Sequence, residues 1–418
     1  MNAAKRVCFS IGALTSFLIL ILLSCLILYV FLKSSSIEKS KDATEELLSG
    51  NLTYDPALHL KRKSEELVHW INTNSDSMWQ ARLNPHAVGL KSDEETETVI
   101  YQSNLVMQNK MRELEQMKPE AVYEQYDKHL RSLEQQKRPI PSHFNAAKRW
   151  PNCSQNILKV RDQGGCGSCW AVAATSVISD RICIASKEET NIVLSAQALI
   201  ECCSYCGACN GTMDPLLPFV YWVEHGLASE ECYPYTVSTD CGSPCRPETF
   251  YSPKGVFNCS NTCKGKGPYV RHFGKYIYKI GSLSQNPGIE KSAKTLSDRF
   301  QEIGIRSKKA PKSVEELVKR EMMAHGPTML CFNVFEDFMH YYDGVYDYLH
   351  GFPRDHIYDH CVKLIGWGLY KHNGTGQIEK YFTAVNSWGK WGVNGAFKID
   401  LRMLQHFRSD LYAGIPVL

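Results

Sequence analysis

The sequence of 418 residues predicts an α+β protein in which a helical half and a β-rich half share one folded unit. The helical half is indicated by CWAVAATSVISDRICIAS, a nearly continuous apolar run of helix length, and by the shorter SAQALIECC. The β-rich half is indicated by TMLCFNVF, CVKLIGWG and YFTAVNSW, which are rich in β-branched and aromatic residues and are separated by Gly and Asn turns.

The composition is that of an ordinary globular chain. Charged residues make up 22% and aromatic residues 11% of the sequence, so a disordered chain is not expected. The formal net charge is +3, and no cluster of Lys and Arg is long enough to follow a phosphate backbone. Nucleic acid is therefore not an expected partner.

The chain contains 17 cysteines, of which 13 fall between Cys153 and Cys263. Such a density is stable as disulfides only in an oxidising compartment. Glycosylation sequons are permissive for the same compartment, and they stand at Asn51, Asn152, Asn210, Asn258 and Asn373.

Residues 7–32 form an uncharged apolar run of about 26 residues, long enough to cross a bilayer as a helix. Lys5 and Arg6 precede the run, which predicts that residues 1–6 stay cytosolic and that the chain from residue 33 onward is translocated. We interpret the run as a type II signal-anchor, so the membrane is an expected partner. The alternative is a cleaved signal peptide, whose apolar core is usually only about 7–15 residues long.

Residues 33–139 contain no cysteine and are rich in Glu, Lys, Gln and Asn. Strong helix formers and apolar positions at helical spacing predict helix between Met107 and Gln136. The stretch KRPIP then breaks the pattern and offers a linker and a processing site. A compact domain is expected over residues 140–418, with a polar and basic surface insertion at about 282–312; a ligand-binding loop is the alternative for that insertion.

The stretch DQGGCGSCW contains the first candidate site. Cys169 follows a Gly-Ser turn and opens the apolar helical run, with Ser168 as a possible N-cap. A helix N-terminus and a nearby imidazolium lower the pKa of a thiol and make it a nucleophile. Gln163 could donate its side-chain amide to a developing oxyanion. For any single cysteine in this chain, a disulfide half is the alternative interpretation.

The complete string QGGCGSCW resembles the active-site segment of the papain family of cysteine peptidases. The resemblance implies that Cys169 is the nucleophile and that Cys166 is a disulfide half. DHCVKLIGWG resembles the family segment that carries the general base, here His360. VNSWGKWGVNGAF resembles the segment with the orienting asparagine, here Asn386, shielded from water by Trp388.

The implied chemistry is acyl transfer from peptide substrates through a Cys-His-Asn site. The Gln163 side chain and the Cys169 amide are expected to hold the oxyanion. No cofactor is required. A metal cluster at CCSYCGAC is the alternative to disulfides there, but the compartment is oxidising and no histidine completes such a site.

Within the family, several segments resemble cathepsin B: SEELVHWINTNSDSMWQA, IPSHFNAAKRWPNC and the final AGIPVL. The resemblance implies a papain-like two-domain fold, with a helical left domain and a β-barrel-like right domain. It makes residues 33–139 an inhibitory propeptide that is cleaved before about Ile140. Cystatin-type inhibitors are then expected partners, and the expected location is lysosomal, endosomal or extracellular.

The cathepsin B pairing, carried over position by position, implies six disulfides and leaves Cys169 unpaired. These are Cys153–Cys183, Cys166–Cys209, Cys202–Cys259, Cys203–Cys206, Cys232–Cys263 and Cys241–Cys245.

The chain also departs from cathepsin B. The occluding loop that gives cathepsin B its carboxydipeptidase activity carries adjacent histidines, whereas the matching stretch from Cys232 to Cys259 contains none. We therefore expect mainly an endopeptidase.

The expected substrate-binding wall differs as well. At CNGTMDP, with Gly211, Thr212 and Pro215, a threonine stands where the family usually has glycine. Asp410 falls where cathepsin B has an acidic residue at the base of its main specificity pocket, which suggests tolerance of Arg or Lys two residues before the scissile bond. A solvated surface carboxylate is the alternative. Cys331 and Cys361 replace two pocket-lining alanines, either as free thiols or as a seventh disulfide.

A non-catalytic binding or scaffold protein on the same fold is the rival interpretation. It is suggested by Thr212, by the lost histidines and by the Asn210 sequon, because each changes the expected cleft. The retained Gln163, Cys169, His360 and Asn386 favour an active enzyme.

Overall fold

The computed structural model describes residues 56–88, 105–115, 119–134, 138–246, 258–284, 313–347, 349, 351–352 and 354–418. The apolar run at 7–32, the sequon at Asn51 and residues 285–312 of the expected insertion lie outside this part. Among the described helices, none is both long and apolar enough to span a bilayer. The chain divides into two units, residues 1–60 and 61–418; the structure describes only the helical residues 56–60 of the first.

The helices of the second unit gather around α8 (Cys169–Ala185), the helix expected from CWAVAATSVISDRICIAS. Nearly all of its side chains are buried, and this explains why the apolar residues of the helix are not confined to one face. SAQALIECC forms α9 (Ala196–Cys202), whose N-cap Ser195 accepts a hydrogen bond from the Ala198 amide. The remaining helices of this half are α6 (Ala146–Arg149), η4 (Pro151–Cys153), α7 (Ser154–Ile157) and α10 (Leu217–His225).

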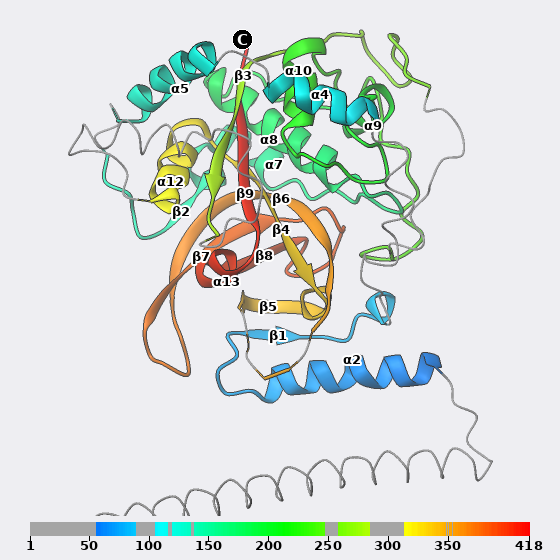
Figure 1. Cartoon of the computed structure of the whole chain (residues 1–418), viewed down its shortest axis with the longest axis vertical. Coiled ribbons are helices and arrows are strands. Elements are labelled where there is room, and N and C mark those ends of the chain that lie inside the picture. The colour runs from blue at the N-terminus through cyan, green and yellow to red at the C-terminus, as the bar shows by residue number, and fades with distance from the viewer. Residues whose placement is uncertain are drawn as a thin grey trace, which may run out of the picture. The chain divides into compact units, whose positions relative to one another are not determined.

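The strands form one sheet with the order β1-β5-β8-β7-β6-β4-β9-β3, and β2 pairs with β6. Figure 1 shows β4 to β8 toward one end of the second unit and α8 to α10 toward the other, with β3 and β9 extending up to these helices. The sheet is mostly antiparallel, and β5 and β8 are its parallel pair. The strands are β1 (Trp79–Ala81), β2 (Phe144–Asn145), β3 (Gly274–Ser282), β4 (Thr328–Phe335), β5 (Tyr341–Tyr346), β6 (His356–Lys371), β7 (Ile378–Val385), β8 (Ala396–Asp400) and β9 (Ser409–Pro416).

This arrangement is the mixed α+β fold that the sequence predicts. TMLCFNVF forms β4, CVKLIGWG supplies half of β6, and YFTAVNSW supplies more than half of β7. Within the described residues the strand order runs as an open path from β1 to β3, so closure into a barrel stays a prediction. Three further elements lie in this half: α12 (Val314–His325), η6 (Glu336–His340) and α13 (Leu401–His406).

Residues from the 33–139 region form α2 (Pro56–Thr73), β1, η1 (Pro85–Ala87), α4 (Leu105–Glu115) and α5 (Pro119–Glu134). The helix predicted between Met107 and Gln136 is thus two helices, and Pro119 begins the second. A proline lacks the backbone N–H that a helix interior requires, but the first turn of a helix accepts it.

A buried ion pair joins the helical half to the sheet. Lys363 Nζ on β6 lies 2.8 Å from Asp180 Oδ2 on α8, and both side chains are almost completely buried. The Lys363 ammonium also donates to the Asn156 carbonyl at 3.0 Å. The pair therefore fixes β6 against α8, the two elements that carry His360 and Cys169.

The structure contains the six disulfides implied by the cathepsin B pairing. It also contains a seventh, between Cys331 and Cys361, which decides between the two alternatives left open for these residues. The seventh bond crosses between β4 and β6, where the two residues face each other in register. Cys169 is the free cysteine of the described residues.

Candidate active site

Cys169 is the first residue of α8, at the end of a tightly packed loop. The Cys166–Cys209 disulfide holds this loop, and the Gly167 amide donates to the Cys209 carbonyl at 2.9 Å. A Cβ at Gly167 would lie only 2.5 Å from that carbonyl oxygen, so the close approach requires glycine. Ser168 occupies the N-cap position without a side-chain capping bond; its hydroxyl instead pairs with the Tyr235 hydroxyl at 2.8 Å.

His360 and Asn386 meet across two neighbouring strands. His360 lies in β6 and Asn386 directly follows β7, and the distance between His360 Nε2 and Asn386 Oδ1 is 2.7 Å. The Asn386 amide group is itself oriented, because its Oδ1 accepts from the Ser387 backbone N–H and its own backbone N–H donates to the Gly395 carbonyl. The Trp388 ring stacks on the imidazole with ring centroids 4.5 Å apart.

The second ring nitrogen, His360 Nδ1, is buried and has no hydrogen-bond partner in the described part of the chain. The backbone amides of Cys361 and Trp170 act to lower the pKa of the Cys169 thiol. Because Cys361 directly follows His360, this influence places the thiol near the segment that carries the imidazole. The arrangement leaves Nδ1 as the nitrogen available to exchange a proton with a reacting group.

Burial governs the protonation of this pair in the described state. Desolvation raises the pKa of the Cys169 thiol to about 11, although the Cys361 and Trp170 amides act to lower it. Desolvation lowers the pKa of His360 to about 4, although the hydrogen bond to Asn386 acts to raise it. In the described state, desolvation therefore acts on both groups toward their neutral forms, a thiol and an imidazole.

Gln163 is buried beside the same loop, with both ends of its side-chain amide engaged. Its Oε1 accepts from the Ser387 hydroxyl at 2.7 Å, and its Nε2 donates to the Cys166 carbonyl at 3.0 Å. The Gln163 backbone N–H donates to the Ser387 carbonyl at 2.8 Å. Ser387, which sequence analysis did not single out, therefore contacts both Gln163 and Asn386; its place directly after Asn386 was the available signal.

Comparison with known proteins places this geometry in a family. The family model described as "Papain family cysteine protease" matches residues 140–408, which is more than half of the chain. The chain belongs to the papain family of cysteine proteases.

Its relatives are cathepsin B-like. The chain is 33% identical over 302 residues to "Cathepsin B-like cysteine proteinase 5" of Caenorhabditis elegans, covering 67% of this chain and 75% of that protein. It is 31% identical over 355 residues to "Cathepsin B-like cysteine proteinase" of Schistosoma japonicum, covering 84% and 90%. Among solved structures, "proCathepsin B S9 from Trypanosoma congolense" matches with a TM-score of 0.55 at 24% identity, covering 85% and 98%, which supports the fold.

The wall at CNGTMDP is ordered by local contacts. Gly211 has a φ of +85°, and a Cβ there would meet no atom within 4 Å, so backbone conformation and not space favours glycine. The Thr212 hydroxyl donates to the Asp214 carbonyl at 3.1 Å, which turns this side chain onto its own loop. Pro215 is buried, and the sequon residue Asn210 is exposed. The sequon residues Asn152, Asn258 and Asn373 are exposed as well.

Asp410 is not the solvated surface carboxylate that was the alternative, because the residue is only 5% exposed and is paired with two cations. Its expected place at the base of the main specificity pocket stays a prediction. Lys279 Nζ lies 3.3 Å from Oδ1, and Arg408 Nε lies 3.1 Å from Oδ2. Asp410 also faces Cys331 in the β4–β9 register, so it adjoins the Cys331–Cys361 bond.

Segments of the 33–139 region contact the cysteine protease on two loops. The Asn84 side-chain amide donates to the Ser243 carbonyl at 3.0 Å, and a Cβ on Gly242 would lie 2.5 Å from the His86 ring. On the other loop, Met107 of α4 is buried against the 207–213 segment, and its sulfur accepts from the Met213 amide.

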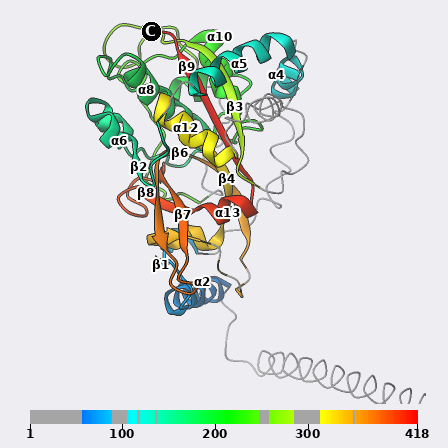
Figure 2. The same ribbon diagram turned by 90° about the vertical axis from the view of Figure 1, so that its left-hand side faces the viewer.

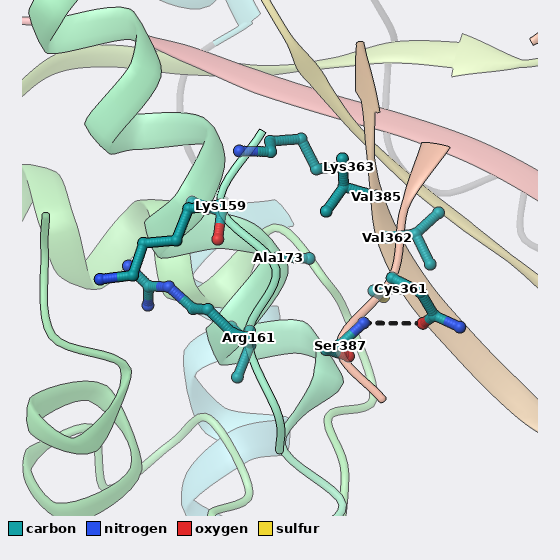
Figure 3. Close-up of a pocket in the computed structure, with 11 residues that line it drawn as sticks. Lys159, Arg161, Ala173, Cys361, Val362, Lys363, Val385 and Ser387 are labelled. Carbon is teal, nitrogen blue, oxygen red and sulfur yellow. Dashed lines mark hydrogen bonds between the residues drawn. The ribbon is translucent and has the colours of Figure 1, made fainter. Parts of the chain in front are cut away.

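A small cavity lies between α8 and strands β6 and β7, lined in part by Arg161, Lys363 and Cys361 (Figure 3). Asn386 and Ser387 also line it, so it lies beside the orienting asparagine. Its volume of about 10 Å³ is that of roughly one water molecule, too small for a substrate side chain.

Proposed function

We propose that this papain-family protease is made as a zymogen and acts as a cysteine endopeptidase, with Cys169, His360, Asn386 and Gln163 as its site. The observation that carries the proposal is the two-sided environment of the His360 ring. Its Nε2 is held by Asn386, and its Nδ1 is buried without a hydrogen-bond partner in the described part of the chain.

The reaction follows from these roles. His360 takes the proton from Cys169, and the thiolate sulfur bonds to the peptide carbonyl carbon. The carbonyl oxygen becomes an oxyanion, which the Gln163 Nε2–H and the Cys169 backbone N–H stabilise. His360 then gives its proton to the leaving amine as the C–N bond breaks. Finally, His360 takes a proton from water, which attacks the thioester and regenerates the thiol.

The test is covalent labelling of the processed protein with an epoxysuccinyl thiol probe at mildly acidic pH. We expect one adduct, located on Cys169 by peptide mapping, and none in Cys169→Ser. The substitution Asn386→Ala should slow labelling without preventing it. An unlabelled Cys169 in a processed, folded protein would support the rival binding or scaffold function.

The zymogen part of the proposal is supported by the contacts of residues 33–139 with the loops at Ser243 and Met213. In this proposal the prosegment covers the site, and its removal restores access to Cys169. We expect the mature N-terminus at about Ile140, as checked by N-terminal sequencing. An active protein that retains residues 105–134 would contradict the inhibitory role.

The endopeptidase assignment rests on the absence of histidine between Cys232 and Cys259. An imidazolium is the kind of group that would hold a free C-terminal carboxylate. We therefore expect internal cleavage of a blocked peptide to be faster than release of dipeptides from a free C-terminus. Equal rates on two peptides of matched sequence would contradict this part of the proposal.

We further propose that the pocket for the side chain two residues before the scissile bond is bordered by Asp410 and the Cys331–Cys361 bond. Two features support a small, uncharged occupant. The disulfide fixes the positions of two side chains at the pocket, so they cannot move aside for a large substrate side chain. The negative charge of the Asp410 carboxylate is offset by Lys279 and Arg408. The alternative is that the Asp410 carboxylate favours Arg or Lys in this pocket, as the resemblance to cathepsin B suggests.

A further inference from the structure

The contact between α5 and α12 contains a cluster of side chains with no role in the proposed reaction. His129 on α5, Glu321 on α12 and His325 on α12 each direct one ligand atom into the cluster, and these three atoms lie within 4.8 Å of one another. The helices are labelled in Figures 1 and 2. Arg181, which contacts the cluster from α8, lies twelve residues from Cys169, or about 18 Å along the helix.

We propose that His129, Glu321 and His325 form a Zn²⁺ site that fastens the prosegment helix α5 to the mature domain. The proposal rests on the zymogen role of residues 33–139 argued above. Two imidazoles and one carboxylate are the donor set that zinc prefers when water fills the fourth position. His325 is partly exposed as a residue, although its Nε2 is itself buried.

To reach zinc geometry the His129 and Glu321 atoms must part slightly, and the His325 atom, which lies within 4.8 Å of both, must approach them by up to about 1.5 Å. His129 Nε2 and Glu321 Oε2 are 2.7 Å apart and share a hydrogen bond. Tetrahedral zinc with bonds of about 2.0–2.1 Å separates neighbouring ligand atoms by about 3.3 Å. The ion would replace the shared hydrogen as the two side chains part by a fraction of an ångström. His325 Nε2 is buried without a hydrogen-bond partner in the described part of the chain, as expected of a nitrogen that awaits a ligand.

The outer partners of these ligands are already in place. His129 Nδ1 pairs with the Tyr276 hydroxyl at 3.0 Å, which fixes the ring so that Nε2 faces the cluster. Glu321 Oε1 accepts from Arg181 Nη1 at 2.9 Å and from the Tyr278 hydroxyl, which leaves Oε2 for the metal. Such partners orient the ligands of most metal sites. Because Arg181 already offsets the Glu321 charge, we expect weaker binding than in structural zinc sites.

Sequence spacing explains why this site was not predicted. Glu321 and His325 are four residues apart and share one face of α12, but His129 lies 192 residues away from Glu321 and on the opposite side of the proposed cleavage point. A site that draws ligands from both sides of that point would be lost when the prosegment leaves.

The test uses the full chain with Cys169→Ser, because a catalytic thiol binds zinc and would also cleave the prosegment. Metal content is measured after dialysis against ZnCl₂ in excess over protein. We expect the parent to bind one zinc ion more than His129→Asn or His325→Asn. His69→Asn, which removes an exposed prosegment histidine, is the matched control and should bind as the parent does. If α5 fails to dock in the His129→Asn variant, that variant alone would be uninformative. His325→Asn still tests the site, because it changes α12 and leaves the sequence of α5 intact.

The second readout is amide hydrogen exchange of residues 119–134 in zinc and in EDTA. Zinc should slow this exchange in the parent and the control but not in the two site variants. Tyr276→Phe keeps all three ligands and should weaken zinc binding by about 10–100-fold. The proposal would be overturned if the parent and His129→Asn bound equal amounts of zinc. It would also be overturned if zinc did not change the amide exchange of the parent. In either case the three side chains would form a hydrogen-bonded contact only. Neither readout uses peptidase activity, so the result is independent of the proposed catalytic function.

Discussion

Asn386 Oδ1 lies 2.7 Å from His360 Nε2 and also accepts from the Ser387 backbone N–H, so this one carbonyl sets the direction of the imidazole. The substitution Asn386→Ala removes the contact while Trp388 still stacks on the ring. A hydrogen bond of this kind is worth about 1.5–3 kcal/mol when the ring is charged. We expect kcat/KM to fall by about ten- to a hundredfold with KM little changed. A rise in KM with kcat unchanged would contradict an orienting role, because it would indicate lost substrate binding.

The intact precursor should react slowly with alkylating agents at neutral pH. Because burial raises the pKa of the Cys169 thiol to about 11, the thiolate fraction at pH 7 is about one in ten thousand. The rate of iodoacetamide labelling should therefore rise as the pH approaches 11. Removal of the prosegment readmits water and should raise the rate at neutral pH. Equal rates in precursor and processed protein would show that the prosegment does not control the thiol.

The pairing of Asp410 predicts a change of substrate preference in Lys279→Met. The Lys279 ammonium lies 3.3 Å from the Asp410 carboxylate. Without it, the negative charge of Asp410 is offset only in part and can attract a positively charged substrate side chain. We expect kcat/KM for Arg over Leu, two residues before the scissile bond, to rise about tenfold, which matches one charged hydrogen bond. Lys275→Met, on the same strand but exposed, is the matched control and should leave the ratio unchanged.

The buried pair between Asp180 and Lys363 predicts non-additive effects on stability. Asp180→Ala leaves the Lys363 ammonium buried without its counter-charge and should reduce the free energy of unfolding by about 3–5 kcal/mol. The double substitution Asp180→Leu with Lys363→Met removes both charges and should be much less destabilising. Denaturant unfolding of the parent and both variants checks the coupling. Equal losses in the single and double variants would contradict it.

The sequence predicted the parts of the fold that local patterns determine. The apolar run after Ser168 specifies α8, and the β-branched runs specify β4, β6 and β7. The order of the three site motifs predicted the meeting of His360 and Asn386. What local patterns could not supply was pairing between distant residues: Asp410 with Lys279, or Glu321 with His129. These contacts depend on strand register and helix packing, which no single segment encodes.

The Cys331–Cys361 bond has a practical consequence for anyone who measures this enzyme. Cys361 directly follows His360, and its backbone amide acts to lower the pKa of the Cys169 thiol. Reducing agents added to keep Cys169 as a thiol act on disulfides by the same exchange chemistry. A preparation in which this bond has opened carries three thiols around the base instead of one. Its rates then describe a different molecule from the one that an oxidising compartment produces.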